Sequence, residues 1–131
     1  MFNHVMIGSN DIERSKAFYD AVLATLGAGG AMRNVAASGH TRLFYMHGGG
    51  IFAVSEPIDG GPATCANGAT IGFKCDSPEQ VRTFHDVAVA AGGSSIEEPP
   101  GLRDGGALGP LHLSYVRDPD GNELCAIHRP G

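Results

Sequence analysis

Apolar and polar positions along this chain follow two different periods, and the same succession of periods occurs twice. In each half, apolar residues recur at steps of three and four, which predicts one amphipathic helix per half. The positions are Phe18, Val22 and Thr25 or Leu26, then Val81, Phe84, Ala88 and Ala91. Shorter apolar or alternating runs surround each helix and predict strands. The runs after the helices span residues 30–37, 41–47 and 51–56, then 92–97, 111–117 and 122–128.

A shift of 66 positions superimposes the two halves, since residues 3–27 then lie over residues 69–93. Five identities fall in register, at Glu13/Glu79, Phe18/Phe84, Asp20/Asp86, Ala24/Ala90 and Gly27/Gly93. Capping signals also match: Asn10 is followed three residues later by Glu13 in the first helix, and Asp76 or Ser77 is followed by Pro78 and Glu79 in the first turn of the second. HGGG (47–50) and DPDG (118–121) predict a hairpin turn in each half. Both halves therefore have the pattern β-α-β-β-β.

The predicted fold class is α+β, built from two tandem modules. One module of about 60 residues buries little surface, so we expect the two to share a core in a single domain over residues 1–131. Module one covers residues 1–56, residues 57–68 form the linker, and module two covers residues 69–131.

Composition narrows the partners to a small molecule or another protein. The formal charge of −5 and the lack of a Lys/Arg cluster argue against nucleic acid and anionic lipid, which need a basic surface. No apolar run is long enough to span a membrane. The three cysteines form no Cys-x-x-Cys motif, and no signal-peptide pattern opens the chain. We therefore expect a cytoplasmic location.

The paired modules, the AFYDAVLATLG helix, the FHDVAVAAGG helix end and the RDPDGNEL hairpin resemble the vicinal oxygen chelate superfamily over residues 3–128. This superfamily includes glyoxalase I, extradiol dioxygenases and bleomycin resistance proteins. The resemblance implies one curled, cup-like mixed sheet with the helices packed outside. It also implies a divalent metal held by His, Gln or Glu side chains from the first and last strands of each module, and a homodimer.

The metal-ligand positions of the family are only partly filled in this sequence. His4 stands where the family commonly places its first histidine. The equivalent position in module two is Thr70, and the last strands place Ala53 and Cys125 where carboxylates are expected. Glu56 could be drawn in by a strand bulge. The candidate metal residues are therefore His4, Glu56 and Cys125.

The ligand chemistry of these residues favours a protein without a bound metal. The alternative is one divalent ion of zinc, nickel, manganese or iron. Thr70 and Ala53 cannot replace imidazole or carboxylate, and a catalytic zinc usually has three protein ligands. His4 could instead be a hydrogen-bonded strand histidine, and Cys125 a small buried hydrophobe.

Six further residues are candidates for substrate binding. Arg42 and Arg103 could pair with an anionic ligand, and Arg103 lies in a Gly/Pro-rich segment, residues 98–110, predicted to be a loop at the rim. Aromatic and imidazole side chains on the predicted strands could form a wall of the cup. These are Tyr45, Phe52, His112 and Tyr115.

Two functions of different classes remain open. The first is an enzyme of the glyoxalase-like lyase or dioxygenase type, with a depleted metal site. The second is a metal-free protein that sequesters a small molecule, as in the bleomycin-resistance branch. The loss of ligand positions favours the second, and family membership favours the first.

Overall fold

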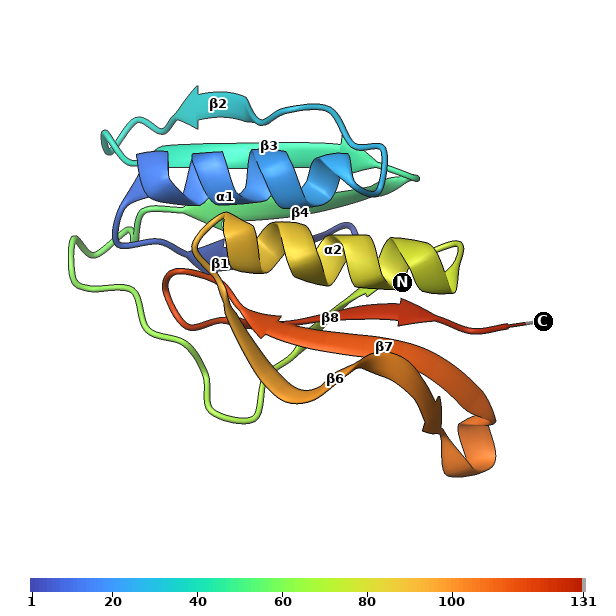
Figure 1. Ribbon diagram of the computed structural model, residues 1–131. Coiled ribbons are helices and arrows are strands. Elements are labelled where there is room, and N and C mark those ends of the chain that lie inside the picture. Colours follow the sequence, from blue (N-terminus) through green and yellow to red (C-terminus); the bar gives the residue numbers. More distant parts are fainter. Residues whose placement is uncertain (131) are drawn as a thin grey trace.

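The computed structural model describes residues 1–130 and shows two modules of the same element order (Figure 1). Module one contains β1 (His4–Gly8), α1 (Ile12–Ala24), β2 (Met32–Val35), β3 (Thr41–His47) and β4 (Gly50–Ser55). Module two contains β5 (Ile71–Lys74), α2 (Pro78–Ala90), β6 (Ser94–Asp104), the short 3₁₀ helix η1 (Gly106–Leu108), β7 (Pro110–Arg117) and β8 (Glu123–His128). The predicted α+β class and the tandem β-α-β-β-β modules are confirmed.

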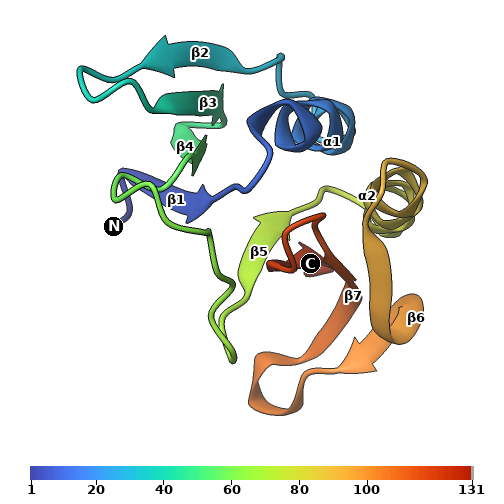
Figure 2. The ribbon, with the colours of Figure 1, turned by 90° about the vertical axis from the view of Figure 1, so that its left-hand side faces the viewer.

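Hydrogen bonds between strands stay within each module. The strands form two mixed four-stranded sheets, sheet A with the order β1-β4-β3-β2 and sheet B with the order β5-β8-β7-β6. In each sheet the first strand pairs in parallel with the last, while the other pairs are antiparallel. The curled, cup-like mixed sheet that the resemblance implied is divided into two four-stranded sheets, which lie next to each other at β1 and β5 (Figure 2).

Each helix begins at a side-chain cap. The Asp11 carboxylate accepts from the Arg14 amide at the start of α1, and the Ser77 hydroxyl accepts from the Gln80 amide at the start of α2. Asn10, the predicted cap of α1, instead exchanges hydrogen bonds with the linker at Ala63. A polar pair such as Asn10–Asp11 offers two possible caps, and tertiary contacts decide between them. No helix of the described residues is long and apolar enough to cross a membrane.

One hydrophobic core runs through both modules because the two helices lie side by side between the sheets (Figure 2). Phe18, Tyr19 and Phe84 are fully buried on the helices. Phe52 of β4 and Phe73 of β5 join the modules, with ring centroids 5.4 Å apart. Each fully buried aromatic side chain contributes about 1.5–3 kcal/mol by leaving water, so this shared core holds the modules together.

The DPDGN turn of module two also contacts α1 of module one. Asp118 is 4% exposed, and its carboxylate accepts from the Tyr19 hydroxyl and from the amides of Asp120 and Asn122. Asp120 in turn forms an ion pair of 2.9 Å with Arg14. The turn therefore has a structural role in addition to connecting β7 to β8.

The predicted loop at residues 98–110 is largely a strand. β6 continues to Asp104, with a register shift between Ile96 and Gly101, and pairs with β7 along its outer part. Prolines 99 and 100 fall within the irregular stretch, where ladder hydrogen bonds are interrupted, so the strand tolerates them. Arg103 consequently lies on a strand.

Candidate functional site

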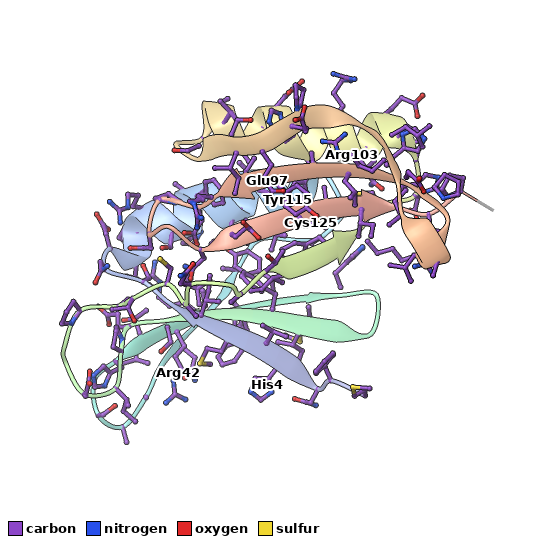
Figure 3. All side chains as sticks on the ribbon, turned by 90° about the horizontal axis from the view of Figure 1, so that it is seen from below. His4, Arg42, Glu97, Arg103, Tyr115 and Cys125 are labelled. Atoms are coloured by element: carbon purple, nitrogen blue, oxygen red, sulfur yellow. The ribbon has the colours of Figure 1, made fainter. Side chains whose placement is uncertain are left out.

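Strand alternation separates each sheet into a face toward the helices and a helix-free face. Leu124 and Ala126 of β8 pack in the core with the helices, so Cys125 between them points to the helix-free face of sheet B. Cys125 pairs with Tyr115 of β7 and with Gly72 of β5. Figure 3 shows Cys125 and Tyr115 together on module two, close to Glu97.

The thiol of Cys125 is protonated at neutral pH. Burial raises its pKa, and the neighbouring carboxylates of Glu123 and Glu97 raise it further, while a hydrogen bond with Tyr115 opposes them. Burial also raises the pKa of the Tyr115 hydroxyl, with added contributions from Cys125 and the same carboxylates. Because the thiolate is the form that attacks electrophiles and binds metals, Cys125 is poorly suited to either task.

Glu97 reaches this face through an unusual backbone conformation. Its φ is +59°, and it is the one non-glycine residue with positive φ among residues 1–130. It follows Ile96 directly, at the point where the β6–β7 register shifts. A bulge of this kind changes the direction in which a side chain points. The positive φ costs about 1–2 kcal/mol for an L-residue. Glu97 is not among the residues predicted for the site; the Pro-Pro-Gly at 99–101 is the sequence signal of irregular backbone near it.

The remaining ligand position of module two is also engaged within the protein. The Thr70 hydroxyl donates to the Glu123 carboxylate. Thr70 comes directly before β5, and Glu123 begins β8, its parallel neighbour. The cluster on the helix-free face of sheet B is thus made of Thr70, Glu97, Tyr115, Glu123 and Cys125.

His4 lies on the other sheet. It is exposed at the start of β1, and its Nδ1 lies 2.8 Å from the side-chain oxygen of Asn3. Ala53, the fourth family position, is fully buried between Met6 and Phe44.

Glu56 lies in a third place, just beyond β4. Its carboxylate accepts from the Thr41 amide at 2.7 Å, and it lines a cavity of about 340 Å³ with Ser9 and His40. The structure therefore does not bring His4, Glu56 and Cys125 together. Within residues 1–130, no three His, Cys, Asp or Glu side chains are grouped as a metal ion would require. The donor chemistry of His4, Ala53, Thr70 and a protonated Cys125 does not fit the metal that the fold family implies.

The six predicted substrate-binding residues divide among five environments. Arg42 shares the helix-free face of sheet A with His4, and Tyr115 pairs with Cys125 (Figure 3). Arg103 occupies the outer part of β6, where its guanidinium donates to the Pro99 carbonyl.

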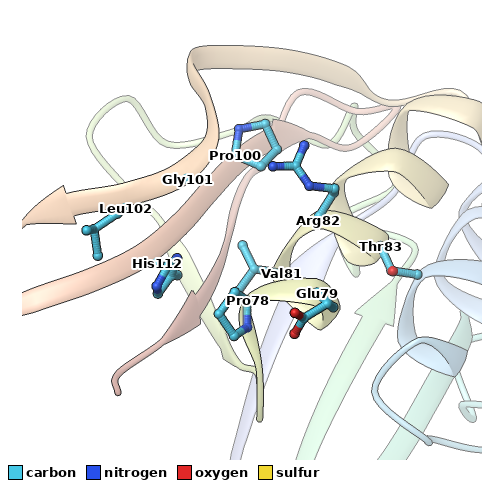
Figure 4. A pocket seen from close by; sticks show the side chains of 9 residues that line it. All are labelled: Pro78, Glu79, Val81, Arg82, Thr83, Pro100, Gly101, Leu102 and His112. Atoms are coloured by element: carbon cyan, nitrogen blue, oxygen red, sulfur yellow. The ribbon is translucent and has the colours of Figure 1, made fainter. Parts of the chain in front are cut away.

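The other three predicted residues face the helices. His112 lies opposite the first two turns of α2, across a cavity of about 380 Å³ that Leu102 and Arg82 also line (Figure 4). Tyr45 and Phe52 are buried on the helix side of sheet A, and both line a cavity where the modules meet. The hydroxyl of Tyr45 donates to Asp20 of α1 at 2.8 Å.

Comparison with known proteins agrees with this architecture. The sequence matches the Glyoxalase/Bleomycin resistance protein/Dioxygenase superfamily over residues 1–126. The chain belongs to this superfamily. A comparison with the curated proteins found no match.

Solved structures include several of the same fold. A glyoxalase/bleomycin resistance protein from Albidiferax ferrireducens T118 is 54% identical, with a TM-score of 0.91 over 98% of this chain and 99% of that one. A glyoxalase-related enzyme from Fulvimarina pelagi is 21% identical, with a TM-score of 0.73 over 99% and 88% of the two chains. A lactoylglutathione lyase from Agrobacterium tumefaciens is 16% identical, with a TM-score of 0.64 over 98% and 92%. The similarity to the last two structures shows a shared fold and nothing about function.

Proposed function

We propose that this protein binds a small organic molecule without a metal ion, in the manner of a ligand-sequestering member of the superfamily. The observation that carries the proposal is the state of Cys125. At the position where the family would place a metal-binding carboxylate, the chain has a buried thiol whose pKa is raised. A hard divalent ion prefers oxygen ligands, and zinc requires the thiolate.

The cluster on sheet B favours a ligand that donates hydrogen bonds or carries positive charge. Glu97 and Glu123 present carboxylates beside the ring of Tyr115, which offers an apolar face. The net charge of −5 would also attract a cationic ligand. Arg42 and Arg103 lie further along the helix-free faces, so they would contact only a larger ligand (Figure 3).

A homodimer is part of the proposal. Met6, Met32 and Met46 lie on the helix-free face of sheet A and are 41%, 53% and 53% exposed. An apolar patch of this kind commonly marks a protein interface, and a second copy would shield it. Sedimentation equilibrium should give twice the chain mass for the native protein, and Met46→Glu should shift it toward the monomer.

Calorimetric titration in a chelating buffer tests the ligand site. The probe is metal-free bleomycin, the cationic molecule after which part of the superfamily is named. We expect binding that the chelator does not reduce and that Glu97→Gln weakens about tenfold, the loss expected for a charge-assisted hydrogen bond. Glu98→Gln is the matched control and should bind as the native protein does. Stoichiometric uptake of nickel or zinc by the protein alone, in a buffer without chelator or bleomycin, would instead support the lyase or dioxygenase alternative.

A further inference from the structure

A cavity of about 440 Å³ lies where the two modules meet, beside the edge strand β5. Most of its apolar lining faces the helices, whereas Lys74 pairs with Ile127 and lines the cavity from the end of the edge strand. The cavity is bounded by the end of α1, the β3–β4 hairpin and β5. Its apolar lining includes Val5, Leu23, Leu26, Ala28, Ile51, Phe52, Ile71 and Phe73. The volume is within the range of small-molecule sites, about 300–1,000 Å³.

The polar side chains inside this cavity are already bonded to the protein. The Tyr45 hydroxyl donates to Asp20. The amide of Gln80 accepts from the Asp76 backbone and donates to the Thr25 carbonyl, so both of its polar atoms are occupied. An occupant would therefore meet an apolar interior, and the part of it that enters must be apolar, because an unpaired polar group there would lose its hydrogen bonds to water.

The exposed part of the lining is polar and carries two potential donors. His47 ends β3 and Lys74 ends β5, and both are exposed. Within residues 1–130, the side chains of both are without an ion pair, whereas Lys16, the other lysine, pairs with Asp20 at 2.6 Å. Asp76 is the one acidic side chain of the lining. Because the lining offers His47 and Lys74 as donors and Asp76 as its one carboxylate, it favours a ligand with an anionic head group over one with a cationic head group.

We propose that this cavity binds a small monocarboxylate with an aromatic or aliphatic body, its apolar part against Phe52 and Phe73 and its carboxylate at Lys74 and His47. The rings of Phe52 and Phe73 meet nearly edge to face, at 74°, and present an aromatic wall to the cavity. The lining shares no residue with the cluster around Cys125, although Gly72 of the lining is the β5 neighbour of Cys125. It also gives a role to Tyr45 and Phe52, the two predicted substrate-binding residues that face the helices.

Titration of the isotope-labelled full chain with 4-phenylbutyrate, followed by amide chemical shifts, tests the proposal. We expect saturable shifts at residues that line the cavity, with a dissociation constant of about 1 mM or tighter for a ligand of this size. The neutral analogue 4-phenylbutan-1-ol should bind about three- to tenfold more weakly, because it retains the apolar body and lacks the charge.

Two variants with matched controls locate the site. Ala28→Leu adds bulk to the cavity lining and should weaken phenylbutyrate binding at least about tenfold, whereas Ala90→Leu on the exposed face of α2 should not. Lys74→Gln should reduce binding of the carboxylate to the level of the alcohol, with Arg129→Gln, another exposed cation, as the control. Thermal unfolding of each variant establishes that it is folded before it is titrated.

Three results would overturn the proposal. The first is the absence of saturable shifts in the cavity lining, and the second is binding that Ala28→Leu leaves intact in a folded variant. The third is equal binding of the alcohol and the carboxylate, which would exclude the anionic class. Failure of bleomycin binding at the Cys125 cluster leaves this test unaffected, because the two sites share no residue.

Discussion

The hydroxyl of Tyr19, in the middle of α1, donates a hydrogen bond to the carboxylate of Asp118, in the turn between β7 and β8. The two residues are 99 positions apart, and both are almost completely buried. This contact joins a helix of module one to the turn that leads into Cys125. The turn therefore fixes where β8 begins relative to the first module, and with it the position of the cluster on sheet B.

Removing this hydroxyl should destabilise the protein. Tyr19→Phe leaves the buried Asp118 carboxylate without its donor from α1, which costs about 1–3 kcal/mol of the free energy of unfolding. Urea denaturation measures the change. In a double-mutant cycle with Asp118→Asn, the two effects should be clearly less than additive, because both variants break the same hydrogen bond. Full additivity would show that the contact does not couple the modules.

Alkaline pH should destabilise the fold through Cys75. Burial raises the pKa of its thiol from 9.0 to about 11. Between pH 9 and 11 the unfolded chain loses a proton that the folded chain keeps, so the free energy of unfolding falls as the pH rises. The slope from this group is at most about 1.4 kcal/mol per pH unit.

Urea denaturation at several pH values through this window measures the slope. Cys75→Ala should make the decrease shallower than in the native protein. Cys65→Ala, which removes an exposed thiol, is the control and should leave the slope as it is. An unchanged slope in Cys75→Ala would show that burial does not hold this thiol in its protonated form.

The three thiols should differ sharply in reactivity. Cys65 is exposed, whereas Cys75 and Cys125 are 1% and 5% exposed and have raised pKa values. Iodoacetamide at pH 8 should therefore modify Cys65 first, and all three only after denaturation. Mass spectrometry of the peptides measures the extent at each site. Modification of Cys125 as fast as Cys65 in the native protein would contradict its assignment as a buried, protonated thiol.

Glu97 should be more important for binding than for stability. Its φ of +59° is a conformation that glycine adopts without steric cost. Glu97→Gly removes the backbone strain and should raise the free energy of unfolding by up to about 1 kcal/mol. Because glycine also increases the entropy of the unfolded chain, the net change is between zero and this value. The same change at Glu98, where φ is not positive, should lower the free energy of unfolding. Denaturation of both variants gives the comparison, and a large destabilisation by Glu97→Gly would refute backbone strain at this position.

The repeated pattern was sufficient to predict the fold because its signals are local. The helical spacing of Phe18 and Val22, the Ser77–Pro78 start of α2 and the DPDG turn each depend on neighbouring residues. The outer part of β6 was missed for the opposite reason. Pro99 and Pro100 argue locally against a strand, and pairing with β7, which the sequence does not display, overrides them.

The candidate site could be predicted only in part. Alternation predicts that Cys125 and Ile127 share a face, but it does not say which face is free of helices. The neighbours of Cys125 depend on strand register and on the bulge before Gly101, both of which are tertiary features. Glu97 therefore remained unrecognised, and Tyr45 and His112 could not be assigned to the helix side before the structure was known.

Metal content decides whether the protein works without a metal ion. Protein purified without added metal, and again after incubation with zinc, nickel, manganese or iron(II) salts and desalting, is measured by elemental analysis beside His4→Ala. We expect far less than one equivalent of any metal, equal in both proteins. One equivalent of a divalent metal in the native protein that is lost in His4→Ala would contradict this expectation.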